Sequence, residues 1–133
     1  LRMKAIRVYR VPLSDEAIAL LLSLKAAQQL TPEAAGSAYV FVTTRADKPI
    51  SNMAALALLK RIGRTDITPH GMRSTFRDWA AEKTDHAREV AEAALAHTLT
   101  NKVEAAYQRG DLLAKRAALM SDWATFLADA LAE

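Results

Sequence analysis

Apolar residues recur at helical spacing along most of this 133-residue chain, and they stop where proline, glycine or a capping residue intervenes. A spacing of three or four residues gives each helix one apolar stripe, so the pattern restricts the chain to a mainly helical fold. Alanine and leucine supply much of the apolar half of the composition, which favours helices further. Helices are predicted over six stretches: residues 17–29, from Ser51 to Gly63, from Pro69 onward, 88–96, from Asn101 onward, and 112–131.

Two short stretches have the pattern of strands instead. Residues 6–9 alternate apolar and polar side chains before Pro12, which predicts a β-hairpin over residues 1–13, and residues 39–42 form a short apolar run. The expected fold class is therefore α+β, mainly α with a small antiparallel hairpin or sheet. The length suits one domain with a real core. Its expected parts are a hairpin at 1–13, a core at 14–111 and a C-terminal helix at 112–133.

Composition excludes several classes of function. The chain has no cysteine, which removes disulfides, zinc knuckles and thiol catalysis. His70, His86 and His97 lack the short spacing of a metal site and no acidic pair is placed to join them, so we predict neither a metal nor another cofactor. No apolar run is long enough to span a bilayer and no secretory signal opens the sequence. A cytoplasmic, nucleoid-associated location in a bacterium is expected.

The charge distribution favours an anionic partner. Lysine and arginine number 18 against 15 acidic residues, a mild excess, so the arrangement of the charges matters more than their total. The tail after Gly110 carries more acidic than basic residues. A basic cluster predicts contacts with a DNA backbone, although a solvated helix face is the commoner fate of such a run. The cluster consists of Lys60, Arg61, Arg64, Arg73 and Arg77.

Four side chains suited to phosphodiester chemistry follow one another in a fixed order: His70, Arg73, His97 and Tyr107. Cutting a phosphodiester without a metal requires neutralisation of charge on the non-bridging oxygens during in-line attack. The guanidinium of Arg73 matches two phosphate oxygens with its planar fork. Tyr107 can form a covalent ester that stores the bond for later rejoining. The imidazoles can donate to phosphate oxygens or transfer a proton.

Each of these residues, taken alone, also has an ordinary structural interpretation. His70 could lie near the first turn of a helix, and Arg73 could be a solvated helix charge. His97 could favourably end a helix, and Tyr107 could be a core aromatic at helical spacing. Single short motifs are weak, so only the joint order and spacing favour catalysis.

This order, in which His-x-x-Arg is followed by a second histidine and then by a tyrosine ten residues later, resembles the active-site signature of the tyrosine recombinases, the phage integrase family. The sequence around these residues most resembles that of integrases from prophages and genomic islands of the phage P4 type. The resemblance covers nearly the whole chain and implies site-specific DNA recombination through a 3′-phosphotyrosyl intermediate. It also implies double-stranded attachment-site DNA as partner, a homotetramer on that DNA and host DNA-bending factors.

A fifth catalytic residue is implied by the same resemblance. Family members carry a lysine in a β-hairpin, shortly before a Val-Pro or Ile-Pro pair, that protonates the departing 5′ oxygen. Lys4 occupies that place before Val11-Pro12. Lysine can serve as the acid because its proton is transferable, whereas that of arginine hardly is. The alternative is a hairpin lysine that binds backbone phosphate or water.

One family element is missing from these residues. Members of the family carry another arginine upstream of the hairpin lysine, in a motif like Thr-Gly-x-Arg-x-x-Glu, and no such motif occurs in these residues. The chain also begins within the expected hairpin without an initiator methionine, so we expect a fragment of a catalytic domain that is inactive alone. Two other functions stay open: a type IB topoisomerase-like enzyme, and a non-catalytic DNA-binding remnant of a decayed integrase.

The last predicted helix has two possible packing partners. Gly110 and Asp111 separate it from the stretch that carries Tyr107. Its apolar stripe could pack on its own domain, as such stripes usually do. Alternatively, the resemblance implies that a C-terminal segment can pass to a neighbouring protomer on DNA, and the glycine could permit that exchange.

Overall fold

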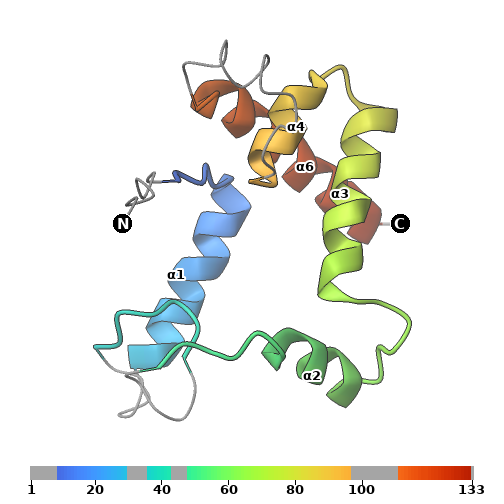
Figure 1. Ribbon diagram of the computed structural model, residues 1–133. Coiled ribbons are helices and arrows are strands. Elements are labelled where there is room, and N and C mark those ends of the chain that lie inside the picture. The colour runs from blue at the N-terminus through green and yellow to red at the C-terminus, as the bar shows by residue number, and fades with distance from the viewer. Residues whose placement is uncertain (1–8, 30–35, 43–47, 97–110, 133) are drawn as a thin grey trace, which may run out of the picture. The chain divides into compact units, whose positions relative to one another are not determined.

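The fold of the described residues is mainly helical, as predicted. The computed structural model describes residues 9–29, 36–42, 48–96 and 111–132. Figure 1 shows the helices of this described part, α1 (Asp15–Gln29), α2 (Ala54–Arg61), α3 (Pro69–Lys83), α4 (Arg88–Ala94) and α6 (Leu113–Ala132). None of these helices is long and apolar enough to cross a membrane.

The β-structure expected from the sequence is not confirmed. The predicted strand over residues 39–42 is wrong, because these residues are irregular and contribute only an isolated antiparallel bridge between Val42 and Pro49. The carbonyl of Val40 instead accepts a hydrogen bond from the side-chain amide of Gln28. Most of the predicted hairpin lies outside the described residues, and the part that is described, residues 9–13, is irregular.

The chain divides into two compact units, one formed by Leu1–Ser14 with Phe76–Glu133 and the other by Asp15–Thr75. The second unit contains α1, α2 and the first turns of α3. Its helix α1 buries no side chain. Leu59 of α2 is the buried hydrophobic residue in the described part of this unit. Most of the core therefore belongs to the first unit.

The C-terminal end of α2 is set by local hydrogen bonds. Gly63 follows α2 with a φ of 77°, a left-handed conformation that favours glycine. The amide of Gly63 donates to the carbonyl of Lys60 (3.1 Å) and that of Arg64 to the carbonyl of Leu59 (2.8 Å), which is the Schellman pattern. This confirms the predicted helix end at Gly63.

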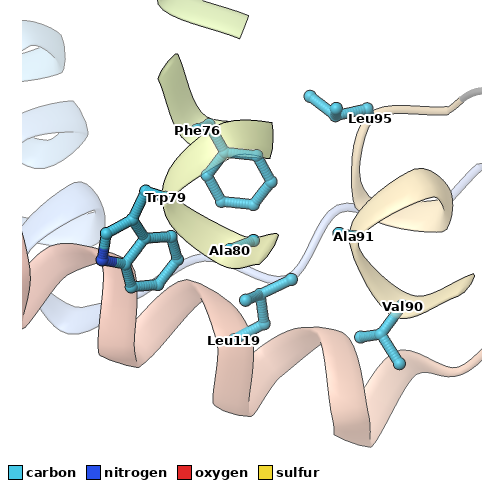
Figure 2. Packing of buried hydrophobic residues seen from close by; sticks show 7 residues of the cluster. All are labelled: Phe76, Trp79, Ala80, Val90, Ala91, Leu95 and Leu119. Atoms are coloured by element: carbon cyan, nitrogen blue, oxygen red, sulfur yellow. The ribbon is translucent and has the colours of Figure 1, made fainter. Parts of the chain in front are cut away.

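The core of the first unit joins three helices (Figure 2). It consists of Phe76, Trp79 and Ala80 from α3, Val90 and Ala91 from α4, Leu95 just after α4, and Leu119 from α6. Trp123 extends this core, with ring centroids 5.4 Å from Phe76 and 4.8 Å from Trp79. Such aromatic pairs contribute about 0.5–1.5 kcal/mol beyond the area they bury. The predicted buried stripe of α3, Phe76 with Trp79 and Ala80, is confirmed.

Helix α6 packs on its own unit in this structure. Leu119 is fully buried at 0% exposure, and Met120 and Trp123 pack against the same cluster. The outer end of the helix is different, because Phe126 and Leu131 are 39% and 89% exposed. The first of the two packing arrangements expected from the sequence is therefore the one observed in the single chain.

Candidate functional site

His70 and Arg73 lie in the first turns of α3, three residues apart and both exposed. Residues at this spacing project from the same helix face, so their side chains can address one ligand. The Thr68 hydroxyl caps the helix by accepting a hydrogen bond from the amide of Gly71 (2.9 Å). Pro69 takes the first helical position, where its missing N–H is not needed. The cap and the proline were both predicted, and together they fix where the helix begins.

Gly71, between the two candidate residues, leaves room for this cap. A Cβ at this position would lie 3.2 Å from Oγ1 of Thr68, closer than ordinary van der Waals contact. The positive end of the helix dipole also lies in this turn, where it favours an anion. The sequence Thr-Pro-His-Gly-x-Arg therefore places an imidazole and a guanidinium at a capped helix start.

Lys4, His97 and Tyr107 lie outside the described residues. Of the five candidate residues, the structure thus brings together His70 and Arg73, and the assignment of the other three stays a prediction. The residues on either side of 97–110 are described, namely Ala96 and Asp111. These two flanking positions are the described residues nearest in sequence to His97 and Tyr107.

The backbone is strained on both flanks. Ala96 has a φ of 55° and Leu112 a φ of 52°, both in the left-handed region that non-glycine residues rarely adopt. Such a conformation costs roughly 1–2 kcal/mol per residue. Ala96 directly follows the last turn of α4, where its amide donates to the carbonyl of Ala93 (3.2 Å). Leu112, on the other flank, packs against the core of the first unit.

Ion pairs reduce the basic cluster expected from the sequence. Arg64 forms two hydrogen bonds of 2.8 Å to Asp66, and the guanidinium lowers the pKa of that carboxyl to about 2. Arg77 donates through Nε to Glu92 on α4 (2.8 Å). Arg64 and Arg77 therefore each have an acidic partner within the chain, which weakens the argument from charge alone.

The sequence analysis missed a group of four residues that we call the Arg116 cluster: Tyr9, Arg10, Asp111 and Arg116. Arg116 is 1% exposed, the one buried charged residue in the described part of the chain. The sequence did contain a sign of this burial, because Arg116 lies at helical spacing from Leu119 and Trp123, in the apolar stripe of α6. A charge inside an apolar stripe indicates a buried partner rather than a solvated face.

A surface hollow in the first unit lies elsewhere and does not suit DNA. It is lined by Trp79 and Phe126 together with three carboxylates, Asp85, Asp122 and Asp129. His86 Nε2 lies 2.7 Å from an Asp122 oxygen within it. Lys83 also lines the hollow, but the three carboxylates outnumber it, which disfavours phosphate. The lining contains neither His70 nor Arg73, so this hollow is not the candidate site. Among the described residues, no three His, Cys, Asp or Glu side chains lie together as a metal site would require.

One comparison with known proteins found relatives, and these are of one class. The chain is 36% identical over 125 residues to prophage integrase IntA of Escherichia coli K12, covering 92% of this chain and 29% of that protein. It is 36% identical over 131 residues to prophage integrase IntZ of the same organism, covering 98% and 31%. The integrase of Shigella phage Sf6 is 31% identical over 133 residues, with 94% and 31% covered.

The other two comparisons gave no match. No protein-family model matches the chain. The search of solved structures likewise found no significant match. The match to the curated relatives extends over nearly all of this chain, which spans about 30% of their length. The chain is therefore a relative of the prophage integrases along the part of them that it spans.

Proposed function

We propose that this chain forms part of the catalytic domain of a tyrosine recombinase that integrates and excises a mobile element. The observation that carries the proposal is the His70-x-x-Arg73 pair on one face of a capped helix start. The relatives named prophage integrases support it, because they match the chain through the segment that contains this pair. The substrate is double-stranded DNA with a specific attachment site.

The proposed reaction is a phosphoryl transfer to tyrosine. The phenolic oxygen of Tyr107 attacks the phosphorus of the scissile phosphodiester in line with the 5′ oxygen. A bond from phosphorus to tyrosine forms, the bond to the 5′ oxygen breaks, and the 5′ oxygen takes a proton from Lys4. The phenol loses its own proton to a histidine. Attack by a 5′ hydroxyl on the phosphotyrosine reverses these steps and rejoins the strand, so no external energy source is needed.

Arg73, His70 and His97 stabilise the phosphate in this scheme. Charge on the two non-bridging oxygens is met by the guanidinium fork and by imidazole N–H donors. The shared face of His70 and Arg73 suits this role, because both side chains are exposed and project from the same turn region. The helix start adds a smaller attraction for the anion.

The chain by itself is proposed not to turn over. The 133 residues contain no Thr-Gly-x-Arg-x-x-Glu motif. One of the two arginines that bind the phosphate in the family therefore has no counterpart in these residues. Loss of one transition-state donor costs about 3–4 kcal/mol in a comparable oxyanion site, or a 10²- to 10³-fold lower rate. Activity is therefore assigned to the full-length protein, acting as a homotetramer on DNA with host bending factors.

The same missing arginine supports a second candidate, a DNA-binding remnant of a decayed integrase without catalysis. A nicked attachment-site substrate separates the two, because a cleaved strand then diffuses away and leaves the protein covalently attached. The full-length protein is compared with Tyr107→Phe, and Tyr39→Phe serves as the matched control because Tyr39 is an exposed tyrosine of the second unit.

An adduct with the unaltered protein and with Tyr39→Phe, absent with Tyr107→Phe, would support the recombinase. An adduct that persists in Tyr107→Phe would mean that another residue is the nucleophile. Retained DNA binding without any adduct would favour the remnant. Recombination between two attachment sites would then separate the recombinase from a topoisomerase, which relaxes supercoils without joining two sites.

A further inference from the structure

We infer that Arg116 is a positioning residue for DNA cleavage, because the Arg116 cluster ties together the chain segments next to Lys4, His97 and Tyr107. The inference rests on the proposed function. It goes beyond the motif residues, since none of Tyr9, Arg10, Asp111 and Arg116 belongs to the His-x-x-Arg, His, Tyr series. All four lie in the first unit.

Arg116 holds two main-chain carbonyls from segments far apart in sequence. Its Nη2 donates to the carbonyl of Arg10 (2.6 Å), and its Nη1 donates to the carbonyl of Asp111 (3.2 Å). The guanidinium carbon lies 4.6 Å from the ring centroid of Tyr9, a cation–π contact. Nε has no hydrogen-bond partner among the described residues. Within the described part of the chain, the side chain thus contacts main-chain carbonyls and a ring, and its charge also acts on the Asp111 carboxyl.

Tyr9 extends the cluster to the end of α4. Its hydroxyl lies within hydrogen-bond distance of two carbonyls in the last turn, those of Ala93 and Ala94 (2.9 Å for Ala94). Helix ends leave such carbonyls without intrahelical partners, so a phenol donor can hold the end of the helix. His97 follows Ala94 by three residues.

Arg10 ties the same segment to the start of α6. Its Nε and Nη2 donate to one carboxylate oxygen of Asp111 (2.9 and 2.6 Å), and the other oxygen accepts from the amide of Leu113 (3.2 Å). The hydrogen bonds from Arg10 also hold the pKa of the Asp111 carboxyl below its usual value. Tyr107 precedes Asp111 by four residues.

The cluster therefore fixes three points of the chain relative to one another. These points are Tyr9–Arg10, five residues after Lys4; Ala93–Ala94, just before His97; and Asp111, just after Tyr107. The left-handed turns at Ala96 and Leu112 lie directly beside two of them. In-line attack tolerates little misplacement, and an error of about 1 Å can cost about 100-fold in rate. Arg116 would act on cleavage through these anchor points, without touching DNA.

The test measures cleavage and binding separately in the full-length protein. Arg116→Met keeps the volume and removes every donor, Arg116→Lys keeps the charge without the fork, and Tyr9→Phe removes only the hydroxyl. Lys115→Met is the matched control, because it removes the same charge from the neighbouring exposed position. For each variant, we would measure single-turnover adduct formation at saturating nicked DNA, the DNA Kd and the Tm.

We expect Arg116→Met to slow adduct formation about 10- to 100-fold, with an unchanged DNA Kd and no loss of Tm. Arg116→Lys and Tyr9→Phe should be intermediate, and Lys115→Met should match the unaltered protein. Equal cleavage rates in Arg116→Met and Lys115→Met would overturn the inference while leaving the proposed function intact. Rates that fall only in step with Tm would overturn it too, and Tyr9→Phe decides the matter if Arg116→Met fails to fold. No adduct in the unaltered protein would overturn both proposals.

Discussion

The start of α3 offers a test in which one substitution should change sign with its background. Gly71 is the third helical residue, and glycine is about 1 kcal/mol less favourable than alanine inside a helix. Gly71→Ala would therefore stabilise an otherwise unconstrained helix. Here its Cβ would lie 3.2 Å from Oγ1 of Thr68, the atom that accepts the hydrogen bond from the Gly71 amide. The methyl group must displace the hydroxyl and weaken the cap.

The magnitudes of the two effects are similar. Loss of an N-cap side chain costs about 0.5–2 kcal/mol, typically about 1 kcal/mol. In the unaltered protein, Gly71→Ala should therefore gain nothing or cost a few tenths of a kcal/mol. In a Thr68→Ala background the cap is already gone and the hydroxyl no longer obstructs the methyl group. There the same substitution should stabilise the protein by about 0.5–1 kcal/mol.

Urea unfolding of the four proteins in this cycle measures the coupling free energy directly. We expect it to be about 1 kcal/mol between the two positions, equivalent to a Tm difference of about 3–5 °C in a domain of this size. Thr68→Ser keeps a hydroxyl and should behave like the unaltered protein. If Gly71→Ala stabilised both backgrounds equally, the cap would not be crowded and the reasoning would be refuted.

Three further outcomes are expected. Leu119→Ala should lower the free energy of unfolding by about 2–5 kcal/mol in urea titrations, because Leu119 is 0% exposed, whereas Leu131→Ala, at an 89% exposed position, should change it by less than about 0.5 kcal/mol. Ala96→Gly should raise it by up to about 1 kcal/mol, because glycine relieves the positive φ. The Asp66 carboxyl should titrate by NMR at about 2 in the folded protein, so its stabilisation is present above pH 3.8 and is lost as the pH falls toward 2; in Arg64→Gln its pKa should return toward 3.8.

The end of α2 and the start of α3 could be predicted because their causes are local, whereas α2 begins at Ala54 rather than at Ser51, and α4 ends at Ala94 rather than at Ala96. Thr68 and Pro69 start α3, and Gly63 ends α2, through contacts within four or five residues. The strand expected at residues 39–42 failed for the opposite reason. An apolar run forms a strand only when another strand supplies its hydrogen bonds, and the described residues supply one bridge from Pro49. The sequence pattern does not contain that information.

Of the residues discussed for the candidate site, some could be predicted from local sequence and others could not. The pairing of His70 with Arg73 on one face follows from their spacing in a helix that the sequence predicts. The Arg116 cluster does not, because Tyr9 and Arg116 meet across more than a hundred residues. In sequence, Arg116 counted as one more charge of the tail. Only its position in the stripe of Leu119 indicated otherwise.

The energetics of Arg116 separate a stabilising role from a positioning role. Burying a guanidinium costs several kcal/mol, and replacement of buried charges by apolar groups of similar volume is often neutral or stabilising. The two carbonyls that Arg116 binds lie in partly buried hydrogen bonds, on residues whose side chains are exposed, Arg10 and Asp111. Arg116→Met should therefore leave the free energy of unfolding unchanged or raised while cleavage slows. A side chain kept for stability alone would give the reverse, a lower free energy of unfolding with an unchanged rate per folded molecule, so the signs of the two effects decide between the roles.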